Sequence, residues 1–344
     1  MKNTFQYDLI PTLLRVLSNK RLEHGFLYGS HGNSYDIFQN IKKPILTVNI
    51  REVNNDVFEK DSEKYVKKSR YYFSNEEFGY SRKIPFKNKN AQFLFTKNNE
   101  NFINFTFNKS YNAYSEFVLS RHFLPERVLS PFIYWQLLKL NFLSLHCSVI
   151  SKNGKGLIIF ALPDTGKSMT AFNLVKKYNF EFVAEDIAVT DGKLIYTTPY
   201  TRSGVWFVDN NRKKKKESFI SKRSIKDRII DYLPEEKIHT IPINVEIHGI
   251  IILKDGQKGI TEIPKNIAKT RLYSLNSSEF HTISNSHVLN CSSLTGFPDI
   301  YNLTQKEISI LDSVIDNSNF IIELQSHNSN EFVEDINTYA KKYI

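Results

Sequence analysis

The chain has few cysteine, methionine and tryptophan residues, and it lacks any long apolar run. Each of these three residue types occurs twice in 344 residues. Two cysteines, Cys147 and Cys291, are too few for a disulfide framework or a zinc site, and the apolar, strand-like segments around them predict buried thiols. No segment approaches the roughly 18 consecutive apolar residues that a membrane-spanning helix needs. These absences argue against a disulfide scaffold, a structural zinc protein and a membrane partner.

Other signatures are also missing. Asp8 and Arg15 interrupt the N-terminal segment MKNTFQYDLIPTLLRVL, which therefore does not fit the apolar core of a signal peptide. The chain contains no internal repeat, no Asn-Lys-x-Asp guanine signature and no LSGGQ signature of ABC-type ATPases. We therefore expect a cytoplasmic protein outside the guanine-switch and ABC classes.

Positive charge is in excess. The formal net charge of +10 and the pI near 9.2 favour an anionic partner, which can be a nucleic acid, an acidic protein or a phosphorylated small molecule. The densest basic run, residues 212–216, has no interleaved aromatic side chain of the kind that stacks on bases. A solvated loop is the favoured interpretation, ahead of a docking patch for an acidic substrate, and nucleic acid is not the expected partner.

Hydrophobic patterning divides the chain near residue 140. Leucines at helical spacing predict a helix within residues 7–17, after the constraint imposed by Pro11. The segments KPILTVNI, AQFLFT and NFINFTF then read as strands, separated by the polar turns KNKN and KNNEN. We expect a small antiparallel, β-rich domain over residues 1–124, a connecting helix over 125–140, and a second domain over 141–344.

The second domain opens with a strand, a loop, a helix and another strand. The segment LIIF predicts an apolar strand that ends at Phe160, where FALPDTGKSM begins, and residues 168–177 have the spacing of a packed helix. The next predicted strand, FEFVA, ends at Glu185 and Asp186. The pattern x-x-x-x-G-K-[ST] is weak by itself, and this context is what favours a Walker A phosphate loop.

A phosphate loop needs backbone N–H groups at a helix N-terminus, a lysine for the β and γ phosphates, a hydroxyl on Mg²⁺ and an acidic group near the metal. Gly166, Lys167, Ser168 and Asp186 supply these groups in turn. The residues that we expect to contact the nucleotide are Pro163, Asp164, Thr165, Gly166, Lys167, Ser168 and Met169.

The loop departs from the pattern at its first position, where Ala161 replaces glycine. A left-handed conformation at Ala161 would cost about 1–2 kcal/mol, whereas one charge-assisted hydrogen bond contributes about 1.5–3 kcal/mol. We expect the alanine to weaken or reshape the site without abolishing it. Pro163 stiffens the loop and removes one N–H donor.

These segments together resemble a known family. SLHCSVI with its His146, the turn NGKG, the strand LIIF, the loop ALPDTGKS and the segment FVAEDIAV follow one another as in the catalytic domain of HPr kinase/phosphorylase and its relatives, which include peptide Ser kinases of lasso-peptide clusters. HGIIILKDG, FIIELQ and EFVEDINTYAKKY resemble later elements of the same domain. The resemblance covers residues 140–344 and, more faintly, 110–140.

The resemblance implies a P-loop domain of the HPr-kinase-like, PEP-carboxykinase-like type, α/β in class and α+β for the whole chain. It implies ATP and Mg²⁺ as cofactors, with Ser168 and Asp186 on the metal. His146 would lie beside the γ-phosphate, and Glu185 would be the base that deprotonates the acceptor hydroxyl. The sequence departs from the family at Ala161, at Leu162, where HPr kinases have Asp, and at Glu185, where the family has Asp.

The implied reaction is transfer of the γ-phosphoryl group to a hydroxyl, with serine favoured, on a peptide, protein or small molecule. Two alternatives stay open, namely a nucleotide-dependent switch and a basic ATPase associated with nucleic acid. Glu185 and Asp186 can also be a polar strand end, and Arg202 either a surface residue or an active-site residue. A homo-oligomer also stays open, because HPr kinases assemble as hexamers.

Overall fold

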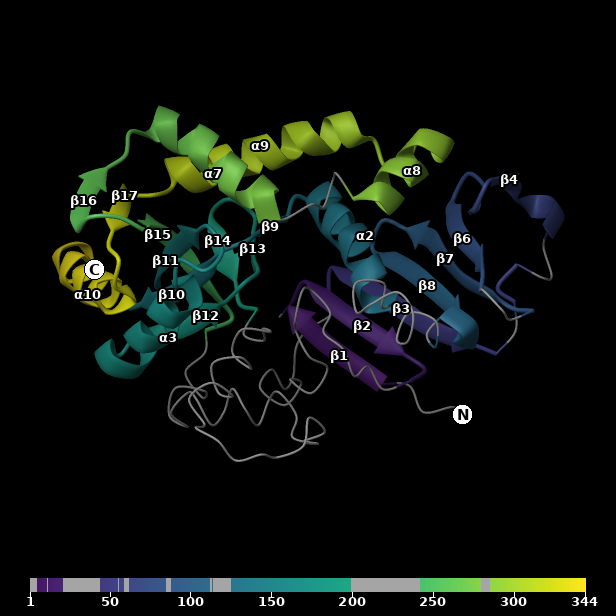
Figure 1. Ribbon diagram of the computed structural model, residues 1–344, viewed down its shortest axis with the longest axis horizontal. Coiled ribbons are helices and arrows are strands. Elements are labelled where there is room, and N and C mark those ends of the chain that lie inside the picture. Colours follow the sequence, from purple (N-terminus) through teal and green to yellow (C-terminus); the bar gives the residue numbers. More distant parts are fainter. Residues whose placement is uncertain are drawn as a thin grey trace. The chain divides into compact units, whose positions relative to one another are not determined.

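The computed structural model describes residues 5–10, 12–20, 44–54, 56–58, 62–84, 88–111, 113, 125–198, 242–279 and 285–344 (Figure 1). The fold is mixed α/β, and the chain forms two compact units. The first comprises residues 1–27, 38–140 and 281–305, and the second comprises 28–37, 141–280 and 306–344. Arg202 and the basic run 212–216 lie outside the described residues.

The first unit is built on an eight-stranded sheet with the strand order β1-β2-β3-β8-β7-β6-β5-β4. The strands are β1 Phe5–Ile10, β2 Leu14–Ser18, β3 Leu46–Val53, β4 Val66–Lys68, β5 Tyr71–Phe73, β6 Glu77–Lys83, β7 Asn90–Asn99 and β8 Phe102–Asn108. This unit also contains the short 3-10 helix Ser62–Lys64 and the helices α2 Pro125–Lys139 and α8 Ser286–Thr295.

Two expectations for this unit are wrong. Residues 7–10 and 14–17 lie in the antiparallel strands β1 and β2 and not in a helix, and Thr12 has φ 65°. The side chains of β2 alternate between buried and half-buried, so its leucine-rich pattern belongs to a half-exposed strand. The sheet is also mixed and not antiparallel, because β2 and β8 both run parallel to β3.

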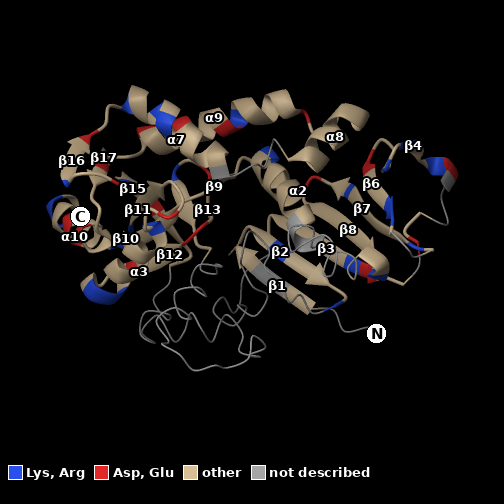
Figure 2. Ribbon diagram, in the orientation of Figure 1, with Lys and Arg blue, Asp and Glu red and all other residues tan. Residues whose placement is uncertain are grey.

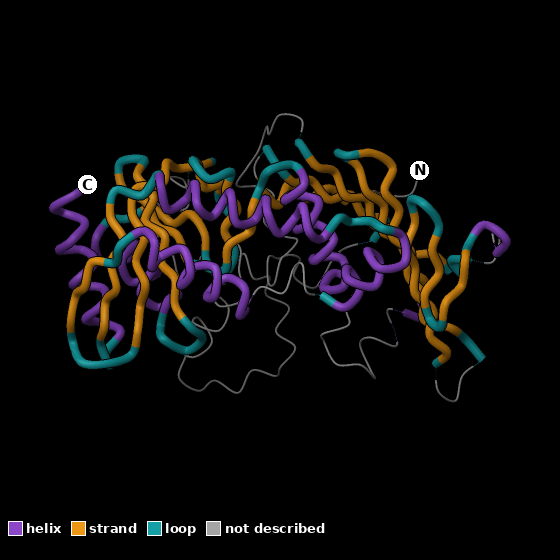
Figure 3. Tube along the Cα trace, turned by 90° about the horizontal axis from the view of Figure 1, so that it is seen from above, coloured by secondary structure: helices purple, strands orange, loops and turns teal. Residues whose placement is uncertain are grey.

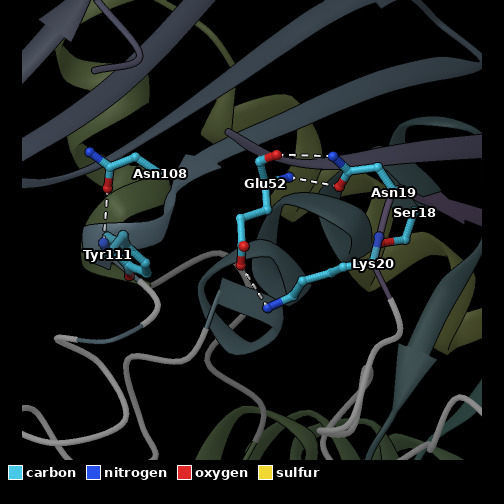
Figure 4. Close-up of polar contacts among 6 residues, drawn as sticks. All are labelled: Ser18, Asn19, Lys20, Glu52, Asn108 and Tyr111. Carbon is cyan, nitrogen blue, oxygen red and sulfur yellow. Dashed lines mark hydrogen bonds and ion pairs between the residues drawn. The ribbon is translucent and has the colours of Figure 1, made fainter. Parts of the chain in front are cut away.

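The carboxyl ends of β2, β3 and β8 carry two separate sets of polar contacts (Figure 4). The Asn19 side chain accepts a hydrogen bond from the Glu52 backbone N–H and donates one to its carbonyl oxygen, both at 2.9 Å. Lys20 Nζ lies 3.0 Å from the Glu52 carboxylate and 5.1 Å from the centre of the Phe107 ring. Asn108 Oδ1 accepts the Tyr111 N–H at 2.8 Å. The polar groups at this edge satisfy one another.

Helix α8 belongs to the first unit, although the sequence expectation placed residues 141–344 in one domain. The His287 ring lies edge-on to Phe93, with centroids 5.4 Å apart, and close to Tyr71 and Tyr80. Asn290 donates a hydrogen bond to the Tyr71 hydroxyl at 3.0 Å. These aromatic contacts group α8 with the β-rich sheet, and the spacing of residues along the chain does not predict them.

The second unit is built on a nine-stranded sheet in which β12-β10-β11-β15-β14-β13-β9 form one path and β17 joins β15 to β16. The strands are β9 Leu143–Leu145, β10 Ser148–Lys152, β11 Lys155–Ala161, β12 Glu181–Ala184, β13 Ala188–Thr190, β14 Leu194–Tyr196, β15 Asn244–Lys254, β16 Gly259–Glu262 and β17 Phe320–Gln325. Among the described residues, this unit contains the helices α3 Lys167–Tyr178, α7 Lys265–Glu279, α9 Ile300–Asp316, which begins within the first unit's residues, and α10 Ser329–Tyr343.

The centre of this sheet is apolar because β11, β15 and β17 run parallel and are covered on both faces. β11 and β15 carry charged residues only at or near their ends (Figure 2). Helix α3 packs on β10, β11 and β12, and α10 packs on α3. Helix α10 is the last element of the chain, and Figure 3 marks the C-terminus beside a helix. This arrangement brings the carboxyl ends of the three parallel strands to one edge of the sheet.

Cysteine burial agrees with the expectation, since Cys147 and Cys291 are both buried free thiols, although Cys291 lies on a helix and not on a strand. Within the described part of the chain, no helix combines the length and the apolar character that a membrane crossing requires.

Candidate active site

The segment 162–166 connects β11 to α3 through two residues with positive φ. Asp164 has φ 63° and Gly166 has φ 95°. Only glycine adopts such a conformation at little cost, which accounts for glycine at position 166. The chain reverses tightly at this point, and the Thr165 N–H donates to the Leu162 carbonyl oxygen at 3.4 Å. The loop therefore ends directly at the first turn of α3.

Ala161 does not lie in the curled part of the loop. It is the last residue of β11, is 4% exposed, and pairs with Leu253 of β15. It is not among the described residues with positive φ. The left-handed penalty considered for this alanine does not arise, because its backbone is extended.

The N-terminus of α3 has no side-chain cap. Gly166 is the N-cap residue, no side-chain hydrogen bond satisfies the first turn, and that turn contains no acidic residue. The first N–H groups of a helix lack intrahelical partners, and the helix dipole makes this end positive. Lys167 adds a cation that is only 8% exposed. The end of α3 is therefore suited to an anion, and to phosphate in particular.

His146 lies between β9 and β10, at the centre of a three-residue turn closed by the Cys147 N–H and the Leu145 carbonyl at 3.2 Å. The turn separates the two strands that were expected to be continuous. His146 Nε2 lies 3.1 Å from Asp186 Oδ1 and 3.1 Å from Lys167 Nζ. The imidazole therefore connects the loop lysine to the acidic residue after β12.

Asp186 lies in a similar turn, where the Ile187 N–H donates to the Glu185 carbonyl at 2.9 Å and Asp186 has φ 71°. Positive φ at a non-glycine residue stores backbone strain, which is common at functional sites. The turn sends the two neighbouring carboxylates to different places. The Asp186 side chain is 24% exposed beside His146, whereas Glu185 is 0% exposed and accepts a hydrogen bond from the Ser168 hydroxyl.

The buried side chain of Asn276 stabilises the turn that contains His146. Asn276 of α7 accepts the His146 backbone N–H at 2.8 Å and donates to the Ser144 carbonyl and the Glu307 carboxylate, each at 3.4 Å. Burial raises the pKa of Glu307. Asn276 was not predicted from the sequence, because it lies 130 residues from His146 and has no local motif.

The loop before α3, His146 and Asp186 line one cavity of about 970 Å³. The predicted residues that line it are His146, Pro163, Asp164, Thr165, Gly166, Lys167, Ser168, Met169 and Asp186. Glu185 is the predicted site residue that is not among the lining residues. The opposite wall contains Asp255, Ser326, His327 and Ser329, which were not predicted, although Asp255 and Ser326 directly follow apolar strands. Polar residues that follow parallel strands are the signal that could have indicated them.

The thiol of Cys147, which is next to His146 in the chain, is unreactive. Cys147 is buried, and burial raises the pKa of its thiol to about 12 despite the opposing charge of Lys167. A thiol with such a pKa is not a nucleophile at neutral pH. The reactive groups around this cavity are therefore the lysine, histidine, hydroxyl and carboxylate side chains.

Comparisons with known proteins do not establish a family for this chain. No family model matches the chain, and no curated protein matches it at the required significance. Among solved structures, a weak neighbour is the Hpr(Ser) kinase/phosphatase from Coxiella burnetii, with a TM-score of 0.21 and 11% sequence identity, covering 35% of this chain and 77% of that chain. A TM-score of this size is too low to support a conclusion about fold or activity.

Proposed function

We propose that the chain is an ATP-dependent phosphotransferase of the HPr-kinase-like type, which moves the γ-phosphoryl group to a hydroxyl of a peptide, protein or small molecule. One observation carries the proposal: the uncapped N-terminus of α3 with Lys167 adjoins the pair His146–Asp186 in a single cavity. Phosphoryl transfer requires positioning and charge neutralisation more than covalent chemistry, and these groups fit both tasks.

The residues present also fit Mg²⁺. The Ser168 hydroxyl lies against the Glu185 carboxylate, and oxygen atoms of these types are the ligands that Mg²⁺ prefers. Mg²⁺ in proteins usually keeps water and phosphate oxygens as ligands besides one or two protein groups. Bound Mg²⁺ would supply positive charge beside the β and γ phosphates.

The geometry favours an exchange of the roles expected for the two carboxylates. We assign Mg²⁺ binding to Glu185 together with Ser168, because the Glu185 carboxylate is buried against that hydroxyl. We assign the base to Asp186, because it lines the cavity. The sequence expectation had Asp186 on the metal and Glu185 as the base, and which order is correct remains a prediction to be tested.

In the proposed step, the acceptor hydroxyl gives its proton to Asp186 while its oxygen forms a bond to the γ-phosphorus. The bond between that phosphorus and the β–γ bridging oxygen breaks, and ADP leaves with the electron pair. His146 holds Asp186 through its Nε2 atom, and Lys167 neutralises charge on the phosphates. The base must lie within hydrogen-bond reach of the acceptor, and Asp186 at the cavity wall satisfies this condition better than the buried Glu185.

The experiment is a transfer assay with γ-labelled ATP and a panel of serine peptides, phosphocarrier proteins and polyols. Lys167→Ala should abolish label transfer, whereas Lys177→Ala, an exposed lysine of the same helix, should leave it unchanged. Label released only as free phosphate, whatever acceptor is offered, would favour a nucleotide switch. ATP turnover stimulated by nucleic acid would favour the third alternative.

A further inference from the structure

The cavity residues Asp255, Ser326, His327 and Ser329 come from elements on the other side of β11 from His146 and Asp186. In the sheet, β10 and β12 lie on one side of β11 and contribute the segments that carry His146 and Asp186, whereas β15 and β17 lie on the other side. Lys254 and Gln325 pair at the carboxyl ends of β15 and β17, so Asp255 and Ser326 follow side by side. The phosphate loop therefore has a reactive flank and a second, unassigned flank.

The cavity is larger than phosphate groups alone require. Its volume of about 970 Å³ is at the upper end of the range of about 300–1,000 Å³ for sites that enclose a whole small-molecule ligand. A triphosphate held at the N-terminus of α3 occupies one part of it. The rest of the nucleotide needs a wall with a chemistry different from that of the loop.

The unassigned flank is not suited to phosphate. The N-terminus of α10 is capped within the protein, because Asn328 accepts the Asn330 N–H at 2.9 Å. The Ser326 hydroxyl accepts the Asn328 N–H at 2.8 Å and donates to the Glu331 carboxylate at 2.7 Å. Asp255 adds a second carboxylate on this side. The Ser326 hydroxyl and the Asn328 and Asn330 N–H groups therefore already have partners, and the carboxylates of Asp255 and Glu331 repel an anion.

The same flank is suited to hydroxyl groups. Asp255 is 76% exposed and His327 is 71% exposed, and His327 Nδ1 lies 2.6 Å from Asp255 Oδ1. An ionised carboxylate only accepts hydrogen bonds, and a ribose diol offers two O–H donors.

We propose that the ribose of the bound nucleotide lies on this flank, with its 2′- and 3′-hydroxyls donating to Asp255 and with His327 holding that carboxylate in place. The inference rests on the proposed function, since it assigns the nucleoside part of the same ligand. The triphosphate then extends from this flank along the loop, and the γ-phosphate reaches the side of His146 and Asp186. The site selects ribonucleotides over nucleotides without sugar hydroxyls.

The test measures dissociation constants of the full chain, in Mg²⁺, for ATP, 2′,3′-dideoxy-ATP and inorganic tripolyphosphate by calorimetry. Asp255→Ala should weaken ATP binding about ten-fold, the size expected for loss of a hydrogen bond to a charged group, and should leave the other two ligands within about two-fold. His327→Gln should give a smaller loss confined to ATP. The control is Asp316→Ala, which removes an exposed carboxylate from the end of α9.

The outcomes separate the two proposals. Equal weakening of all three ligands by Asp255→Ala, or unchanged ATP binding, would overturn the ribose site and leave the kinase proposal standing. Unchanged ATP binding together with a raised acceptor KM would assign the flank to the acceptor. Wild-type protein that binds neither ATP nor tripolyphosphate would overturn the proposed function and the ribose site with it.

Discussion

Each of the two units contains three adjacent parallel strands, and the carboxyl ends of these strands differ in how their polar groups are used. In the first unit, β2, β3 and β8 end in a network in which Asn19, Lys20 and Glu52 satisfy one another. In the second unit, the edge formed by β11, β15 and β17 opens into a cavity, and the N-terminus of α3 has no side-chain cap.

The difference shows that parallel topology alone does not make a site. Carboxyl ends of parallel strands commonly bind ligands, yet binding needs donors and acceptors that the protein itself has left without partners. Gly166 at the N-cap provides such donors because it has no side chain to compete for them. Asn19 does the opposite, since its amide occupies both backbone groups of Glu52. We therefore expect activity to depend on the open edge and stability to depend on the closed edge.

The largest effect is expected at the two neighbouring carboxylates, Glu185 and Asp186. Asp186→Asn should lower label transfer by about 10²–10⁴-fold and leave ATP binding nearly unchanged, because general-base catalysis contributes about that much. Glu185→Gln should cost less, since a glutamine oxygen can still accept from Ser168. Transfer rates and ATP affinities of both variants check this. If Glu185→Gln caused the deeper loss of transfer at unchanged ATP affinity, the base would be Glu185.

The second effect concerns the backbone of the open edge. Gly166→Ala should weaken ATP binding about 5- to 30-fold, because a Cβ at φ 95° costs about 1–2 kcal/mol and would lie 3.3 Å from Ser329 Cβ. The control is Gly154→Ala, which has φ 76° but no atom within 4 Å, in the turn between β10 and β11. It should lose similar stability without losing ATP affinity. Equal ATP binding by both variants would show that the loop conformation does not matter.

A smaller effect is expected at the closed edge. Asn19→Ala should lower the free energy of unfolding by about 1–3 kcal/mol, because it leaves the backbone groups of Glu52 without their partners. Phosphoryl transfer should not change. Denaturant unfolding followed by Trp135 fluorescence, in a Trp206→Phe background, measures the loss, and Asn54→Ala, an exposed asparagine after β3, is the control. Loss of transfer without loss of stability would assign a functional role to this edge.

The smallest effect at neutral pH is expected from His287→Phe in the aromatic cluster of the first unit. Burial lowers the pKa of His287 from its ordinary value of 6.5 to about 4, so the ring is neutral at pH 7 and a phenylalanine keeps the packing. Between pH 6.5 and about 4 the unfolded chain binds a proton that the folded chain does not. The stability of the wild-type protein therefore decreases as the pH is lowered through this range. The His287→Phe variant should not show this part of the decrease in stability at low pH. Unfolding midpoints at pH 7 and pH 4.5 measure it, and an identical pH dependence of both proteins would contradict it.

Local sequence determined much of the second unit. The apolar run LIIF predicted a buried strand, and the Gly-Lys-Ser triplet predicted the start of α3, because strand burial and helix initiation depend on neighbouring residues. The strand FIIELQ was expected from the family resemblance and is present as β17. The leucines of residues 7–17 were misleading, since a short apolar segment fits either period until a partner strand is known.

Tertiary structure decided the rest. Asn276, Asp255 and His327 reach the site from elements far along the chain, through strand order and packing that no local pattern encodes. The different positions of Glu185 and Asp186 also depend on the tertiary fold, because a single strained turn between β12 and β13 buries one carboxylate and exposes its neighbour. The sequence by itself determined that an acidic pair follows the second strand, and only the folded structure decided which carboxylate meets the cavity.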